Sequence, residues 1–137
     1  MTMSEIVTIP LIKIIMFLAA LYAPSNTTEI EIHHADRVEV YTKDGGIWIS
    51  KDGTKDPFTI QGFRLLTPSG FLDLKAELGD LTKHSWSSES ILKIGSDVEV
   101  LKTTEGLLIF PEGIRAPEEP IRVIYNTTGR VRRTVTE

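Results

Sequence analysis

The chain has 137 residues, of which 41% are hydrophobic and 25% are charged. This length and composition indicate one folded domain with its own core, and they exclude a disordered, collagen-like or low-complexity chain. The absence of cysteine excludes disulfide frameworks, thiolate metal sites and cysteine nucleophiles. The formal net charge of −4 gives no general electrostatic basis for binding nucleic acid.

The first distinctive segment is the apolar run Ile6–Ala23, which Pro10 and Lys13 interrupt. A membrane-spanning helix needs about 20 apolar residues. The uninterrupted part, Ile14–Ala23, fits the apolar region of a secretory signal, which has about 7–15 residues. We favour a signal peptide or an N-terminal anchor. Two alternatives stay open: a buried helix or strand of the domain, and a misassigned start codon that makes only part of the segment genuine.

The residues after this segment mark a boundary. Pro24–Thr28 is rich in residues that break regular structure, which indicates a linker. We therefore predict an N-terminal signal or anchor segment with its linker over residues 1–28, and a β domain over residues 29–137. Polar and apolar residues alternate over Glu29–Ile32, and the same phase resumes at Val38 and Val40. This alternation is typical of half-buried strands.

Turn residues recur about every eight to twelve residues along this domain, as in all-β sandwiches and barrels. Asp44–Gly46 predicts a tight hairpin, and Gly62 predicts a bulge. Leu72–Leu81 fits either a strand or a helix, and its alternation together with Gly79 favours a strand. We read His84–Ser90 as a polar loop and Arg130–Thr136 as the last strand.

The whole pattern therefore predicts one fold class. After the N-terminal segment, no run of ten or more residues has a convincing helical stripe. We predict an all-β fold, a jellyroll or sandwich of short antiparallel strands, preceded by one apolar N-terminal helix.

Residues suited to catalysis do not gather in a recognisable motif. His33 and His34 are adjacent, so on a strand they point to opposite faces and cannot easily share a metal. His84 lies in a serine-rich stretch without the G-x-S-x-G pattern of a nucleophile elbow. No phosphate-binding glycine motif occurs either. We predict no catalytic residues, no metal, no cofactor and no enzyme activity, with the histidines exposed or hydrogen-bonded.

The apolar interior is the remaining candidate site. If two facing sheets close fully, their inner side chains form a solid core, and if the sheets splay, the same side chains line a slot for acyl chains. Both outcomes fit the sequence. The predicted inner, lipid-binding stripe consists of Ile32, Val38, Val40, Ile49, Ile60, Leu72, Leu74, Val98 and Val100.

Several of these strands resemble a known family. Ile30–Gly46, with its A-D-R strand and glycine turn, resembles the opening of OstA-type domains, and Phe58–Leu66 with Ser69–Asp80 resembles their second strand pair. Ser88–Gly106 resembles a strand–turn rung of LptC and LptA, proteins of lipopolysaccharide export. The resemblance implies a non-catalytic periplasmic β-jellyroll of outer-membrane biogenesis. Such a jellyroll passes lipid acyl chains along its interior and docks edge to edge with similar jellyrolls, and an uncleaved N-terminal helix would anchor it to the inner membrane.

The last part of the chain resembles a different family. Leu107–Arg132 is similar to the closing strands of GspH- and FimT-type pseudopilins, with an F-P-x-G turn and a G-R-V-R hairpin. We predict a lipid-binding module that contacts the membrane through its N-terminal segment, with a structural subunit of pseudopilin or virion type as the alternative. Lipid carriage predicts an open interior and pairable edge strands. An assembly subunit predicts a filled core and a projecting helix.

Overall fold

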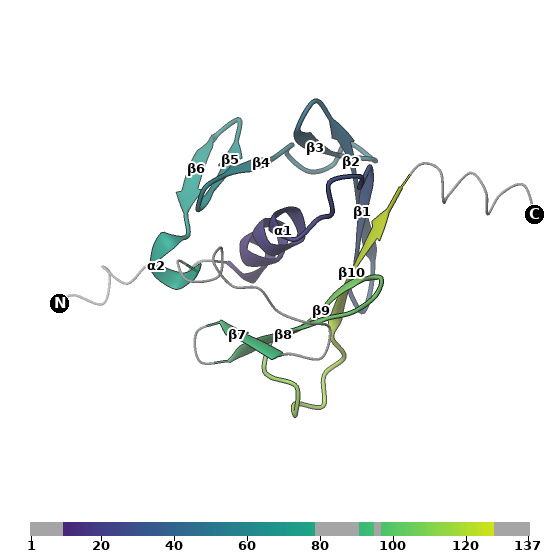
Figure 1. Ribbon diagram of the computed structural model, residues 1–137, viewed down its shortest axis with the longest axis vertical. Coiled ribbons are helices and arrows are strands. Elements are labelled where there is room, and N and C mark those ends of the chain that lie inside the picture. The colour runs from purple at the N-terminus through teal and green to yellow at the C-terminus, as the bar shows by residue number, and fades with distance from the viewer. Residues whose placement is uncertain (1–9, 79–90, 95–96, 128–137) are drawn as a thin grey trace, which may run out of the picture.

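Two antiparallel sheets surround a central helix (Figure 1). The computed structural model describes residues 10–78, 91–94 and 97–127. In chain order the elements are α1 (Leu11–Leu21), β1 (Glu29–His33), β2 (Val38–Asp44), β3 (Ile47–Ser50), β4 (Thr59–Gln61), β5 (Arg64–Thr67), β6 (Gly70–Asp73), α2 (Lys75–Leu78), β7 (Ile91–Ile94), β8 (Val98–Lys102), β9 (Gly106–Phe110) and β10 (Ile121–Asn126). The predicted all-β class is confirmed.

The larger sheet has seven strands in the order β3-β2-β1-β10-β9-β8-β7. It consists of two meanders, β1 to β3 and β7 to β10, which are joined by the pairing of β1 with β10. In that pairing Ile30 lies opposite Tyr125, and Ile32 lies opposite Val123. The first and last described strands therefore meet in the middle of the sheet, and β3 and β7 form its edges.

The smaller sheet has three strands in the order β4-β5-β6 and lies on the other side of α1 (Figure 1). A bridge between Trp48 of β3 and Phe58, next to β4, links it to the edge of the larger sheet. Gly62, where we predicted a bulge, lies in the turn between β4 and β5 with φ +61°. The predicted hairpin at Asp44–Gly46 is confirmed, since β2 pairs with β3 across it.

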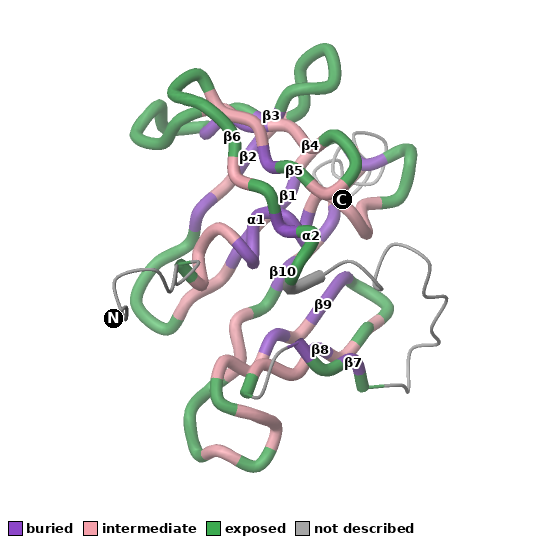
Figure 2. Tube along the Cα trace, turned by 90° about the vertical axis from the view of Figure 1, so that its left-hand side faces the viewer, coloured by how far each residue is buried: buried purple, intermediate pink, exposed green. Residues whose placement is uncertain are grey.

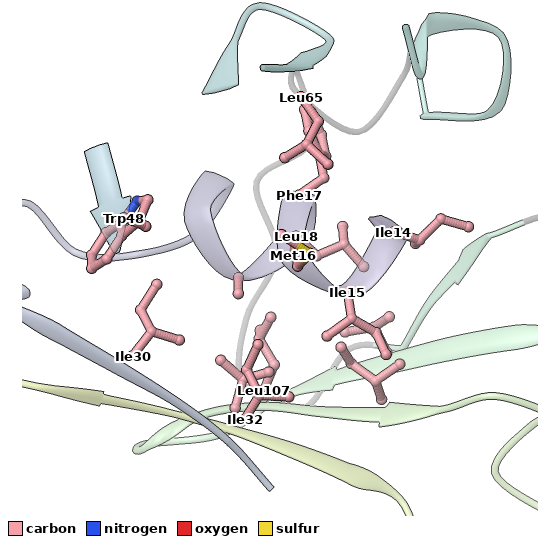
Figure 3. Packing of buried hydrophobic residues seen from close by; sticks show 14 of the residues in the cluster. Ile14, Ile15, Met16, Phe17, Leu18, Ile30, Ile32, Trp48, Leu65 and Leu107 are labelled. Carbon is pink, nitrogen blue, oxygen red and sulfur yellow. The ribbon is translucent and has the colours of Figure 1, made fainter. Parts of the chain in front are cut away.

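One hydrophobic cluster includes α1 and strands of both sheets (Figure 3). Phe17, Leu18 and Ala19 of α1 are 0% exposed. In Figure 2 the buried part of the trace follows α1 and the inner strands, and the exposed part follows the hairpin tips. Because α1 and the strands share one cluster, burial of the helix and assembly of the sheets stabilise each other.

The predicted strand over Leu72–Leu81 is wrong after Asp73, where β6 ends and the short helix α2 begins. The Asp73 carboxylate accepts a hydrogen bond from the Lys75 backbone N–H at 2.9 Å. Aspartate favours such local bonds at helix starts over continuation of a strand. Residues 79–81, the predicted loop His84–Ser90 and the predicted strand Arg130–Thr136 lie outside the described residues.

Candidate functional site

The helix α1 fills the apolar space between the sheets. Its residues Ile14 to Ala19 are buried in an unbroken run, so every side of the helix is covered. A helix that is apolar all round is stable only when it is surrounded by apolar groups. Lys13 is the one charged residue of α1, and it lies near the N-terminal end, where it is half-buried. The interior therefore accepts an elongated apolar segment of about 16 Å, the length of an 11-residue helix.

A tyrosine of β10 holds the C-terminal end of α1. The buried Tyr125 hydroxyl donates a hydrogen bond to the Ala19 carbonyl oxygen at 2.7 Å. The last four carbonyl groups of a helix have no partner within the helix and need donors from beyond its end. Leu18 and Ala20 find theirs in the backbone N–H groups of Tyr22 and Ala23. Burial, and then the nearby Tyr22, raises the pKa of Tyr125, so its hydroxyl keeps the donated proton at neutral pH.

A second polar group on the inner face is Glu39 of β2, which is only 8% exposed. Its carboxylate lies 3.3 Å from Arg37, 3.4 Å from His34 and 3.5 Å from Lys55. Burial acts to raise the pKa of Glu39. The hydrogen bonds from Arg37 and His34, with the charges of His34 and Lys55, outweigh burial and hold it below its usual value. Glu39 is therefore charged at neutral pH beside these three basic side chains.

The Glu39→Gln variant tests this cluster. Because folding lowers the pKa of Glu39, its charge stabilises the fold above the unfolded pKa of about 4.3, and that contribution disappears as the pH falls through the lower folded pKa. We expect the variant to lose about 1 kcal/mol or less at pH 7, since Arg37 and Lys55 are half-exposed. We also expect a flatter decline of its free energy of unfolding below pH 5, measured by urea denaturation. An unchanged pH profile would contradict this role.

The structure divides the nine residues of the predicted lipid-binding stripe between the two faces. Six lie on the inner side. Three of them are fully buried and three are half-buried against the core, in the order Ile32, Leu74, Val100, Ile60, Leu72 and Val98. The other three lie on the outer face of the larger sheet: Val38 and Ile49 are 51% and 37% exposed, and Val40 is half-buried.

The predicted phases of β2 and β3 are therefore wrong: in β3, Trp48 and Ser50 are buried and Ile49 is exposed. In the β1–β2 register Tyr41 lies opposite Ile30, and Glu39 lies opposite Ile32, which puts Glu39 and Tyr41 on the inner face. Tyr41 packs edge-to-face on Phe58 with ring centroids 5.2 Å apart. This contact fixes the strand, and alternation then turns Val38 and Val40 outward.

Cavities lie around the ends of α1. One of about 360 Å³ lies at its C-terminal end, between Tyr22, Thr27, Tyr125 and the turn from β8 to β9. Two of about 310 and 300 Å³ lie beside Lys13 at the other end. A fourth, of about 480 Å³, lies beside β7 and β8 and is lined by Lys93, Glu99 and neighbouring residues.

The described residues contain no group of three metal-ligating His, Cys, Asp or Glu side chains. The His33 ring nitrogen Nε2 donates a hydrogen bond to the Glu31 carboxylate at 2.8 Å, and the His34 ring contacts the Glu39 carboxylate at 3.4 Å. The prediction that these two histidines are exposed or hydrogen-bonded is confirmed, and His84 lies outside the described residues. Among the helices of the described part of the chain, none is long and apolar enough to cross a bilayer.

Sequence reasoning missed Glu39 and Tyr125, and it kept the buried position that α1 has in the structure only as an alternative to a signal peptide or anchor. The sequence does contain a signal for Tyr125. It lies two residues after Val123, so both side chains are on the same face of β10, and a buried tyrosine hydroxyl needs a hydrogen-bond partner.

A search of protein-family models, of curated proteins and of solved structures found no match to this chain.

Proposed function

We propose that this protein is a non-catalytic lipid-binding module that holds acyl chains of a lipopolysaccharide-like lipid in the space between its two sheets. One observation carries the proposal: the space between the sheets accommodates a helix in which six consecutive apolar residues, Ile14 to Ala19, are buried. Acyl chains are slimmer apolar rods and interact with the same aliphatic and aromatic wall.

The proposal includes a periplasmic location, with the N-terminal segment as the contact to the inner membrane. It also includes protein partners of the same jellyroll type, which would pair with an edge strand. Of the two edges of the larger sheet, β3 already exchanges backbone hydrogen bonds with Phe58 at 2.7 and 2.9 Å. The edge at β7, where Ile91 is 49% exposed, is therefore the better candidate for strand addition.

Site-specific photo-crosslinking to lipopolysaccharide tests the lipid site. A photoreactive amino acid replaces Val100 or Leu74, both 0% exposed on the inner side, and a third variant carries it at Ile49 on the outer face. We expect lipid adducts at Val100 and Leu74 but not at Ile49. No adduct at the inner positions, or equal adducts at all three, would refute the proposal.

One observation favours the alternative, a structural subunit of pseudopilin or virion type. The interior is filled by α1, as expected of an assembly subunit, although α1 does not project from the domain. In that function the inner positions give no lipid adducts, and crosslinks form between copies of the chain.

A further inference from the structure

The resident helix and a lipid would compete for one space. Leu18 and Ala19 of α1 are 0% exposed, and so are Val100 and Leu74, the inner positions of the proposed lipid site. All four belong to one hydrophobic cluster. An acyl chain can therefore reach this wall only when α1 moves away.

Besides the apolar contacts of α1, Tyr125 holds the helix in place through a polar contact. Its hydroxyl bond to the Ala19 carbonyl connects the end of α1 to β10, across 106 residues of sequence. When α1 leaves, the Tyr125 hydroxyl loses this partner. The bond is therefore made in the closed state and not in the open one.

Thr27 acts in the opposite direction. Its side-chain oxygen is buried and has no hydrogen-bond partner, and Thr27 as a whole is 2% exposed. A buried hydroxyl without a partner costs free energy that is recovered when water reaches it. Thr27 belongs to the linker between α1 and β1, and this linker borders the cavity of about 360 Å³. Movement of the linker would hydrate Thr27, so this residue favours the open state.

The chemistry of α1 identifies what receives it. Release of six buried apolar residues into water is strongly unfavourable. Transfer from a protein interior to a lipid surface is far less costly, because lipid tails are as apolar as the side chains that α1 leaves. A helix of about 16 Å is too short for the roughly 30 Å hydrocarbon core, so it would lie within the interface.

We propose that α1 is a displaceable plug, which leaves the interior at a lipid surface by a hinge in the linker residues 23–28. The Tyr125–Ala19 hydrogen bond holds the plug in, and the unpaired Thr27 hydroxyl favours its release. The exchange of helix for lipid rests on the proposed function, whereas the hinge and its two controlling residues can be tested without an interior ligand.

Two nearly isosteric variants have opposite expected effects. Tyr125→Phe removes the holding bond, and Thr27→Val removes the unpaired hydroxyl. Amide hydrogen exchange of α1 in buffer should become roughly tenfold faster in Tyr125→Phe and roughly fivefold slower in Thr27→Val, from the usual net effect of one hydrogen bond or one unpaired group. Co-flotation with vesicles of phosphatidylglycerol and phosphatidylcholine should decrease in the order Tyr125→Phe, wild type, Thr27→Val.

The matched control is Thr42→Val, which makes the same chemical change as Thr27→Val on the outer face of β2, away from α1. It should leave both the exchange of α1 relative to β9 and the flotation unchanged. If Tyr125→Phe does not fold, Thr27→Val alone decides, because it is expected to be at least as stable as the wild type. Equal flotation of wild type and Thr27→Val would overturn the plug. If crosslinks at Val100 and Leu74 are absent but the flotation order is as expected, the lipid site is refuted and the plug is not.

Discussion

Replacement of Phe17 by alanine is expected to lower the free energy of unfolding by about 3–5 kcal/mol, the usual cost of removing a fully buried phenylalanine. Phe17 is 0% exposed in the middle of α1 and belongs to the cluster shared with both sheets. Urea denaturation followed by tryptophan fluorescence measures the loss, because Trp48 is itself part of that cluster. The variant thus tests whether α1 is part of the domain.

Phe71→Ala is the matched control, since Phe71 is 60% exposed on β6. Its expected effect is within about 0.5 kcal/mol, as for other surface substitutions. If residues 1–28 acted only as a separate signal or anchor, Phe17→Ala would be as mild as Phe71→Ala. Equal denaturation midpoints for the two variants would therefore contradict the central position of α1 and leave the anchor prediction in its place.

Gly106→Ala is expected to cost about 3 kcal/mol, at the upper end of the range for overpacking. Gly106 begins β9 and lies opposite Ile124 of β10. A Cβ atom there would overlap the Val123 carbonyl oxygen and lie 2.8 Å from its carbonyl carbon. Because the clash is with backbone, no rotamer change relieves it, and β9 must move away from β10. Thermal and urea unfolding should both show the loss.

Gly45→Ala separates this clash from ordinary glycine effects. Gly45 lies in the β2–β3 hairpin with φ +61°, and its added Cβ would meet no atom within 4 Å. The expected cost is the left-handed backbone penalty of about 1–2 kcal/mol. A Gly106→Ala variant no less stable than Gly45→Ala would show that β9 and β10 tolerate a side chain at this position.

The strand pattern was predictable from sequence where one face of a strand is plainly polar. In β1 the residues Glu29 and Glu31 alternate with Ile30 and Ile32, and the structure follows that alternation. In β2 both faces carry apolar side chains: Val38 and Val40 lie on one face, and Tyr41 lies on the other. Local pattern cannot decide such a strand. The choice depends on Phe58, which packs against Tyr41 and lies far along the chain.

For α1 the sequence left a buried position and an anchor both open, and the reason that it could not decide between them is different. Composition shows that a helix needs apolar surroundings, but protein core and lipid are equally apolar to its side chains. The information that distinguishes them lies in partners such as Tyr125, whose role appears only after β10 is placed beside β1. Glu39 was missed similarly, since Lys55, one of its three basic neighbours, comes to it only in the folded chain.

The pairing of β1 with β10 has a consequence for how the chain folds. Each meander is made of neighbouring strands, but their junction joins residues as far apart as Glu29 and Asn126. Contacts of such long range form slowly, because a large loop must close before they stabilise the structure. During synthesis α1 emerges before β10 and lacks part of its cover until β10 arrives. The nascent chain therefore exposes an apolar helix until β10 has been synthesised. In that interval a chaperone or a bilayer can bind the helix before the domain closes around it.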